Sequence, residues 1–317
     1  MEFDCLCTGI LFADHVCSPI DRVPQAGELV VPERMQLGLG GCSSNTALDL
    51  ARLGVKARVA GCVGDDMFGQ FIIDELAAGR VDTSGIRRLS GVNSASSMII
   101  NVRGEDRRFI SSPGANTELT VEHIPAEWAY QAKVLYIGGY LMLPGLESKA
   151  MLELMRAARA EGTTTVLDVV FVRRDDCFEK VALLLPETDV FLPSDDEGAI
   201  LTGLSDPIDQ ANALRDAGAR TVVITRGEAG SLLIGDGVRL RSGVYPAQLV
   251  GGTGSGDALD AGYIAGLLDG RDAAGCLRWG SALGASCVRS IGATESVFNY
   301  EEAVAFMREH TLEIEEF

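Results

Sequence analysis

The residues with the clearest chemical potential lie in one short stretch near the C-terminal end of the chain. Residues 251–257 read Gly-Gly-Thr-Gly-Ser-Gly-Asp, and an apolar pattern of helical period follows to Leu268. Glycines let backbone N–H groups turn toward one point, and the first turn of a helix leaves N–H groups without an intrahelical partner. The stretch therefore predicts an anion-binding loop with a carboxylate beside it.

The position of Asp257 suggests what this loop could do. A carboxylate would repel a bound phosphate unless it takes part in the chemistry. Its natural role is to accept the proton of a hydroxyl group that attacks phosphorus, while the loop stabilises charge on the transferring phosphoryl group. The alternative is that Asp257 only caps its helix, although one glycine would be enough for that purpose.

Two other phosphate-binding motifs do not fit the chain. A Walker A loop needs Gly-Lys followed by Ser or Thr, and none of the four lysines follows a glycine. A dinucleotide fingerprint needs Gly-x-Gly-x-x-Gly after an early strand, and residues 38–41 do not match it.

Composition excludes several classes of protein. The chain has 317 residues, with 27 basic and 45 acidic side chains, and its formal charge of −18 argues against nucleic-acid binding. It contains no apolar run long enough to span a membrane and no secretory signal, so we expect a cytoplasmic protein. Its eight cysteines are scattered and its three histidines stand far apart, which favours reduced, buried thiols over a zinc site.

Short apolar runs alternate with amphipathic segments along the chain. This alternation predicts a buried, mainly parallel sheet covered by helices on both faces. The expected strands are 6–10, 57–63, 134–137, 164–169, 190–192, 221–225 and 231–234. The expected helices are 45–53, 67–78, 146–160, 206–217, 257–268, 273–290 and 300–309.

Two regions break the alternation. Residues 14–38 contain three prolines and few helix signals, and residues 93–112 show alternating strands around a turn at 103–105. We expect them to form a small antiparallel β-sheet lid on a single domain that spans 1–317.

Five motifs in order resemble the ribokinase-like carbohydrate kinases, the PfkB family. Besides 251–259, they are Gly40-Gly41-Cys42-Ser43-Ser44-Asn45-Thr46-Ala47 with 51–54, Gly61-Cys62-Val63-Gly64-Asp65-Asp66, Gly114-Ala115-Asn116 and Thr225-Arg226-Gly227. The matches cover nearly the whole chain. The resemblance implies a three-layer α/β/α fold with a small lid, and an ATP- and Mg²⁺-dependent kinase of small sugars.

The resemblance also implies roles for the glycine-rich stretch and for the N-terminal motif. Asp257 would be the general base, and Gly254, Ser255 and Gly256 would form the anion hole. Asp14 would bind two sugar hydroxyls, with Gly40, Gly41 and Asn45 also touching the sugar. Asn45 could instead be the N-cap of its helix.

Nucleotide and metal contacts are expected at the carboxyl ends of later strands. Thr225, Arg226 and Gly227 would lie near ATP together with Gly254 and Gly256, and 282–292 would pack beside the adenine. Arg226 could equally be an ordinary surface charge. Glu197 matches the Glu of the family's Asn-x-x-Glu motif and would act on Mg²⁺ through water, but Ser194 replaces the Asn. The carboxylates from Asp195 to Glu197 could also merely start a helix.

The acceptor is left open by the sequence. The main expectation is a hydroxymethyl group of a sugar of the ribose, fructose or 2-keto-3-deoxygluconate type. A nucleoside kinase would need aromatic lid residues such as Phe12 or Phe109, and a sugar-phosphate kinase could use Arg103, Arg107 and Arg108. We expect these arginines to form a solvated turn instead. Lid side chains such as Asn93, Ser96, Met98 and Arg107 are candidates for setting specificity. Exposed lid edges also predict a homodimer through the lids.

A departure from the family generates a prediction about monovalent cations. Gly251 and Gly252 replace an Asp and a Thr, and in many members that Asp helps to hold a monovalent cation. Since glycine offers only a backbone carbonyl, K⁺ should activate this enzyme weakly or not at all. Initial rates in K⁺ and in a bulky organic cation test this, and a strong K⁺ dependence would contradict it.

Overall fold

The apolar runs of the sequence form one large central sheet. In the computed structural model, which describes residues 3–105, 107–171 and 176–317, this sheet has ten strands. In sheet order they are β14 (Ile314–Glu316), β13 (Val238–Ser242), β12 (Ser231–Gly235), β11 (Val222–Thr225), β10 (Val190–Phe191), β9 (Thr164–Leu167), β8 (Val134–Gly138), β1 (Cys5–Gly9), β4 (Ala57–Gly64) and β5 (Asp82–Leu89). The strands from β5 to β11 are parallel, and β12, β13 and β14 extend the sheet antiparallel at one edge.

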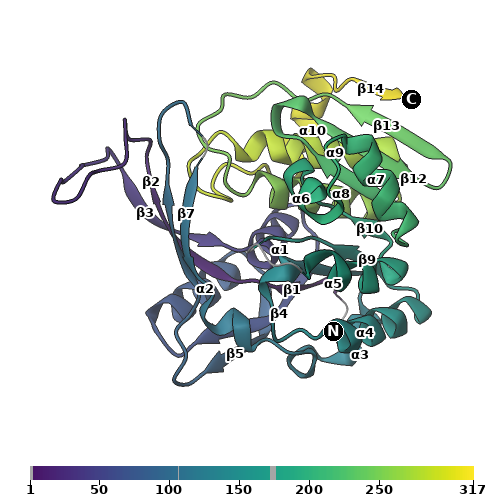
Figure 1. Ribbon diagram of the computed structural model, residues 1–317, viewed down its shortest axis with the longest axis horizontal. Helices are drawn as coiled ribbons and strands as arrows, with labels where there is room; N and C mark the ends of the chain where they lie inside the picture. Colours follow the sequence, from purple (N-terminus) through teal and green to yellow (C-terminus); the bar gives the residue numbers. More distant parts are fainter. Residues whose placement is uncertain (1–2, 106, 172–175) are drawn as a thin grey trace.

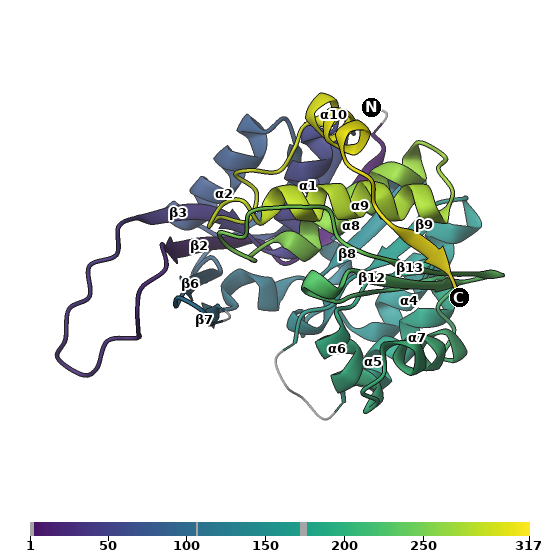
Figure 2. The ribbon, with the colours of Figure 1, turned by 90° about the horizontal axis from the view of Figure 1, so that it is seen from above.

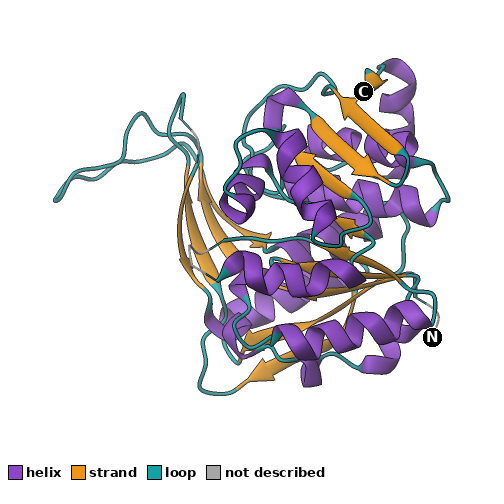
Figure 3. Cartoon of the chain, turned by 45° about the vertical axis from the view of Figure 1, so that its right-hand side comes forward, coloured by secondary structure: helices purple, strands orange, loops and turns teal. Residues whose placement is uncertain are grey.

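Helices cover both faces of this sheet (Figure 3). Alternate residues of a strand bury on opposite faces, so Leu135 and Ile137 of β8 join one core, and Val134 and Tyr136 join the other. The first core is completed by α3 (Ala126–Gln131), α4 (Ser148–Ala160), α5 (Cys177–Leu184), α6 (Asp195–Thr202) and α7 (Pro207–Asp216). The second is completed by α1 (Cys42–Arg52), α2 (Met67–Ala78), α8 (Ser255–Leu268), α9 (Ala273–Cys287) and α10 (Tyr300–Glu309).

A separate four-stranded sheet stands at one side of the domain (Figure 1). This small sheet has the order β3 (Met35–Gly40), β2 (Phe12–Cys17), β6 (Ser96–Ile100) and β7 (Arg108–Ser112). It is built from the two segments that break the α/β alternation, although β2 begins two residues earlier and β3 ends two residues later than 14–38. The expectation of an antiparallel sheet is wrong for its central pair, because β2 and β6 are parallel, while β2–β3 and β6–β7 are antiparallel. The connection between β2 and β3 projects away from the domain (Figure 2). Asp106, inside 93–112, lies outside the described residues.

The predicted fold class is confirmed, but the short helices α3, α5 and α6 and the strands β5, β13 and β14 were not among the expected elements. The strands β5 and β13 were not expected, because each lies at or near an edge of the large sheet and carries charged residues such as Arg87 and Arg239. Expectations based on apolar runs find central strands and overlook half-exposed ones. Whether 1–317 behaves as a single domain and whether the small sheet closes as a lid stay predictions.

Two expectations about composition can be compared with the structure. All eight cysteines are free thiols, and seven of them are buried. Within the described residues, no helix combines the length and the apolarity needed to cross a membrane.

Candidate active site

Three segments that are distant in sequence meet at the carboxyl edge of the large sheet. Asp168 directly follows β9 and accepts a hydrogen bond of 2.9 Å from the N–H of Gly139, which directly follows β8. The Sγ atom of Cys42, at the start of α1, and single carboxylate oxygens of Asp168 and Asp257 all lie within 4.8 Å of one another. The first turns of α1 and α8 therefore converge where ligands bind in open α/β sheets.

Asp257 is oriented by α1, and the capping alternatives for both Asp257 and Asn45 are wrong. The N-cap of α8 is Gly254, and Asp257 is the third residue of that helix. The N-cap of α1 is Gly41, and Asn45 lies inside that helix. The Nδ2 group of Asn45 donates a 2.7 Å hydrogen bond to Oδ2 of Asp257. Asn45 thus links the two helix N-termini, while its own Oδ1 is buried with no hydrogen-bond partner in the described residues.

The glycine-rich loop is tightly packed at Gly254 and open at Gly256. Gly254 has a φ of 81°, and a Cβ atom there would lie 2.5 Å from the carbonyl oxygen of Ala293. A side chain at this position would therefore force the loop away from Ala293. At Gly256 nothing lies within 4 Å of the corresponding Cβ position, so a ligand can approach the backbone. The hydroxyl of Ser255 donates to the carbonyl of Gly252 at 3.0 Å and holds the loop closed.

Several carboxyl groups share this region, and the charge of Asp257 raises the pKa of Asp168 and of Glu197. Burial raises the pKa of Asp257, although hydrogen bonds from Asn45 and Cys42 and the positive charge of Arg107 act in the opposite direction. Burial also raises the pKa of Asp168 well above its ordinary value, and the charges of Glu197 and Asp257 add to this effect. A carboxylate with a raised pKa is a stronger proton acceptor, so Asp257 is suited to the role of a general base.

Asp14 lies on β2 of the small sheet and is part of the same electrostatic environment. Its side chain is 6% exposed, and a Cβ atom at Gly40 would overlap its carboxylate. Burial raises the pKa of Asp14 to about 7, opposed by a hydrogen bond from Ser97 and supported by the charge of Asp257. Gly40 thus leaves room for Asp14, and Gly41 follows it as the N-cap of α1 with a φ of 90°.

The residues expected near ATP lie at the same edge of the large sheet. Thr225 ends β11, and its N–H donates to the carbonyl of Pro193 at 3.0 Å. Arg226 is half-buried, and its N–H donates to the carbonyl of Gly230 at 2.9 Å. Gly227 begins the short 3₁₀ turn that follows. A bridge between Ser194 and Thr225 brings the start of α6 beside this turn.

Glu197 lies in the first turn of α6, which confirms the alternative that the carboxylates from Asp195 to Glu197 start a helix. Ser194 and Glu197 form a capping box, in which Oε2 of Glu197 accepts from the N–H of Ser194 at 2.8 Å and from its hydroxyl at 2.7 Å. Burial raises the pKa of Glu197, the bonds from Ser194 oppose this, and the charges of Asp257 and Asp196 raise it further. This capping role leaves the second carboxylate oxygen of Glu197 for other contacts.

Sequence reasoning missed Asp168 and Cys42 as members of the site. Residues 164–169 were expected to be strand throughout, which placed Asp168 inside it, whereas β9 ends at Leu167. An acidic residue at the end of a buried apolar run was the available signal. Burial raises the pKa of the Cys42 thiol well above its ordinary value, so the thiol stays protonated and can donate to either Asp168 or Asp257.

Comparisons with known proteins now identify the family. The sequence pattern of the pfkB family carbohydrate kinases matches residues 4–299. The chain belongs to the pfkB family of carbohydrate kinases. The expected enzyme class, a phosphotransferase with an alcohol group as acceptor, is confirmed with it.

Individual relatives show how far the similarity extends. The 5-dehydro-2-deoxygluconokinase of Clostridium perfringens is 29% identical over 283 residues, which cover 85% of this chain and 84% of the relative. The aminoimidazole riboside kinase of Salmonella typhimurium is 29% identical over 309 residues, which cover 89% and 93%. The structure of Arabidopsis thaliana ribokinase complexed with ribose and ATP shares the fold, with a TM-score of 0.81, 21% identity and coverage of 97% and 99%.

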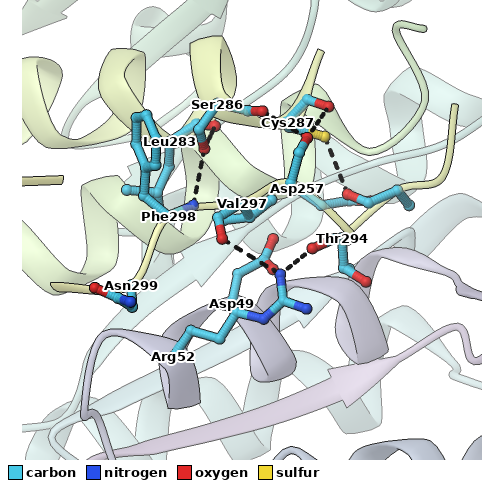
Figure 4. Close-up of polar contacts among 12 residues, drawn as sticks. Asp49, Arg52, Asp257, Leu283, Ser286, Cys287, Thr294, Val297, Phe298 and Asn299 are labelled. Atoms are coloured by element: carbon cyan, nitrogen blue, oxygen red, sulfur yellow. Dashed lines mark hydrogen bonds and ion pairs between the residues drawn. The ribbon is translucent and has the colours of Figure 1, made fainter. Parts of the chain in front are cut away.

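In this carbohydrate kinase, Arg52 of α1 hydrogen-bonds the loop that follows α9, residues 288–299 (Figure 4). Asp49 is fully buried and lies 3.8 Å from Nη1 of Arg52. The same Nη1 donates to the carbonyls of Thr294 and Val297. The Sγ atom of Cys287 donates to the carbonyls of Thr253 and Ala293, at 3.3 Å and 3.0 Å. The glycine-rich loop and the loop after α9 are therefore tied together.

This close packing affects position 251, where Gly251 replaces the aspartate of the family motif. A Cβ atom at Gly251 would lie 2.8 Å from the carbonyl oxygen of Ser290, so the two loops leave little room for a carboxylate side chain there. The observation supports the expectation of weak K⁺ activation, which stays a prediction. The contact of 282–292 with adenine also stays a prediction.

The raised pKa of Asp14 predicts a pH dependence of stability. In the unfolded chain an aspartate titrates near its ordinary pKa of about 4, and in the folded protein Asp14 titrates at about 7. The folded state therefore binds more protons between these values, and this contribution to stability is lost as the pH rises through 7. Relative to wild type, Asp14→Asn should gain about 2 kcal/mol of unfolding free energy between about pH 5.5 and about pH 8.5.

Urea unfolding of both proteins across this range measures the difference. Asp21→Asn is the control, because the carboxylate of Asp21 is 90% exposed. A difference between wild type and Asp14→Asn that does not change with pH would show that Asp14 is ionised throughout.

Proposed function

We propose that this protein transfers the γ-phosphoryl group of ATP to a hydroxymethyl group of a small carbohydrate, with Asp257 as the general base. The observation that carries the proposal is the hydrogen bond of 2.7 Å from Asn45 to Asp257. It holds the carboxylate beside the first turn of α8, where backbone N–H groups favour a bound anion. Asp14, buried on the small sheet, contributes to the same electrostatic environment.

The roles of the residues follow from their chemistry. The carboxylate of Asp14 accepts from two hydroxyls of the sugar, and the unpartnered Oδ1 of Asn45 accepts from another. Asp257 takes the proton of the attacking hydroxyl as its oxygen bonds to the γ-phosphorus and ADP leaves. The N–H groups of Gly254, Ser255 and Gly256 bind the phosphoryl oxygens. Thr225, Arg226 and Gly227 hold the rest of the nucleotide.

The carboxylates of the site also suit Mg²⁺ that accompanies ATP. Magnesium prefers oxygen ligands and keeps several waters, so Asp168 and Glu197 would hold it through water. When bound, the ion neutralises charge on the phosphates. The protonated thiol of Cys42 is a poor ligand for such an ion, and its part is to donate to the carboxylates.

The structure weakens one support for a nucleoside acceptor. Phe12 is 4% exposed and packs in the core, so it cannot stack on a base. Phe109 is 52% exposed and shares a face of the small sheet with Asp14, because Phe109 pairs with Ile99 and Asp14 with Ser97. One aromatic platform is thus available. The small polar residues around Asp14 favour a sugar, and closure of the small sheet over it would exclude water.

Removing the proposed base gives the first test. Asp257→Asn should lower kcat by about 10²–10⁴-fold, because the amide cannot take the proton of the attacking hydroxyl. The affinity for Mg²⁺·ATP should change little. Turnover of wild type identifies the acceptor in a panel of ribose, fructose, 2-keto-3-deoxygluconate, 5-dehydro-2-deoxygluconate, adenosine and a sugar phosphate. Calorimetry measures the affinity of both proteins for Mg²⁺·ATP. Asp269→Asn, at the far end of α8, is the control. Near-normal turnover by Asp257→Asn would remove the assignment.

We further propose that two copies pair through the outer face of the small sheet. Leu37, Met98 and Ile110 lie in one row across it, since Leu37 and Met98 both pair with His15 and Ile110 pairs with Met98. They are 38%, 50% and 63% exposed. Met98 lies on the face opposite Asp14, so the expectation that it sets acceptor specificity is wrong. An exposed apolar row between the edge strands β3 and β7 is typical of an interaction surface.

Glutamates introduced into this apolar row should prevent two copies from pairing. Light scattering should give twice the chain mass of 33.6 kDa for wild type and about one chain mass for a Met98→Glu, Ile110→Glu double variant. Leu183→Glu on α5 is the control, because Leu183 is 46% exposed and lies far from the small sheet in sequence. A monomeric wild type, or a double variant that stays dimeric, would contradict pairing through this face.

A further inference from the structure

One arginine of the small sheet reaches the glycine-rich loop. Arg107 directly precedes β7, and its guanidinium extends to the backbone that leads into α8. A Cβ atom at Gly252 would lie 2.9 Å from Nη1 of Arg107. The guanidinium therefore rests against the entrance of the glycine-rich loop and uses space that a side chain at position 252 would occupy.

The charge of Arg107 acts on the groups around this loop. Burial raises the pKa of both Asp257 and Cys287, and in each case the positive charge of Arg107 lowers it. The guanidinium is thus within electrostatic reach of Asp257 and of the residue that hydrogen-bonds the carbonyl of Thr253. Arg107 is half-buried, and its guanidinium carbon lies 5.6 Å from the centre of the Phe109 ring.

The neighbouring arginines behave differently. Arg103 pairs with Asp21 at 3.0 Å, and its side chain is 66% exposed. Arg108 pairs with Glu105 and is 47% exposed. The expectation of a solvated turn is wrong for the half-buried Arg107. It holds for Arg103, whereas Arg108 is exposed but is the first residue of strand β7. These two residues provide matched controls of the same charge, from the same segment.

We propose that Arg107 is a further catalytic residue, whose guanidinium binds the transferring phosphoryl group in the 252–256 loop. The inference rests on the proposed function. In the reaction, the acceptor oxygen bonds to the γ-phosphorus, the bond to ADP breaks and the proton goes to Asp257, while Arg107 keeps its charge throughout. Its part is to neutralise charge on the equatorial oxygens. Because Arg107 belongs to the small sheet, the charge is in place only when that sheet lies over the loop.

Gly252 leaves the space that the guanidinium of Arg107 occupies. A side chain at this position would push Nη1 of Arg107 away from the loop, because a Cβ atom there would lie 2.9 Å from it. Gly252→Thr should therefore reproduce the loss seen in Arg107→Ala without changing the arginine. Since both changes remove the same contact, the double variant should be no worse than the poorer single variant.

Kinetics of the variants with the acceptor found by the panel test the proposal. Arg107→Ala should lower kcat by about 10²-fold or more, with the KM values for acceptor and ATP within about threefold of wild type. Arg107→Lys should recover part of the loss, and added guanidinium chloride should partly rescue Arg107→Ala. Arg103→Ala and Arg108→Ala should stay within about twofold of wild type. Melting curves show whether each variant is folded.

A binding experiment separates this proposal from the proposed function. Mg²⁺·ADP with aluminium fluoride mimics the transferring group and needs no known acceptor. Arg107→Ala and Gly252→Thr should weaken its binding at least tenfold, and binding of Mg²⁺·ADP less than twofold. A wild type that phosphorylates no acceptor would contradict the proposed function, and this measurement would still decide the role of Arg107.

Two results would overturn the role of Arg107. One is an Arg107→Ala variant whose kcat is unchanged and whose KM is higher only for acceptors that carry a carboxylate or a phosphate. The guanidinium would then bind the acceptor and not the transferring phosphoryl group. The other is unchanged binding of the aluminium fluoride complex by folded Arg107→Ala.

Discussion

The proposed phosphoryl transfer depends on keeping the carboxylate of Asp257 half-buried among other carboxyl groups. Burial raises the pKa of Asp257, and its charge in turn raises the pKa of Asp168 and of Glu197. The first turn of α8, the amide of Asn45 and the guanidinium of Arg107 act in the opposite direction. The balance leaves Asp257 more basic than an ordinary aspartate, which is what a proton acceptor in phosphoryl transfer requires.

This balance couples the small sheet to the rest of the domain. β3 ends at Gly40, Gly41 caps α1, and α1 carries Asn45, so the strand of the small sheet continues into the helix that orients Asp257. Asp14 and Arg107 approach the same region from β2 and from the segment before β7. The position of the small sheet therefore sets how close the charges of Asp14 and Arg107 lie to Asp257.

Most of the fold could be predicted because its signals are local. The central strands and the main helices follow from apolar periodicity, and α2 and α10 begin and end where the pattern does. The starts of α1 and α8 could not be predicted in this way. An Asn or Asp before an apolar pattern is typical of an N-cap, but here glycines with positive φ begin both helices and release the polar side chains for other contacts.

The sequence by itself determined the order of the motifs, the α/β alternation and the residue types at the site, because each depends on neighbours along the chain. Only the tertiary structure decided which of these residues meet. Asn45 and Asp257 are 212 positions apart, and Asp168 reaches them from a third segment. The tertiary structure also distinguished Arg107 from Arg103 and Arg108, which the sequence presents as equivalent. Such contacts depend on how whole elements pack, because burial and distance between remote segments have no local sequence signal.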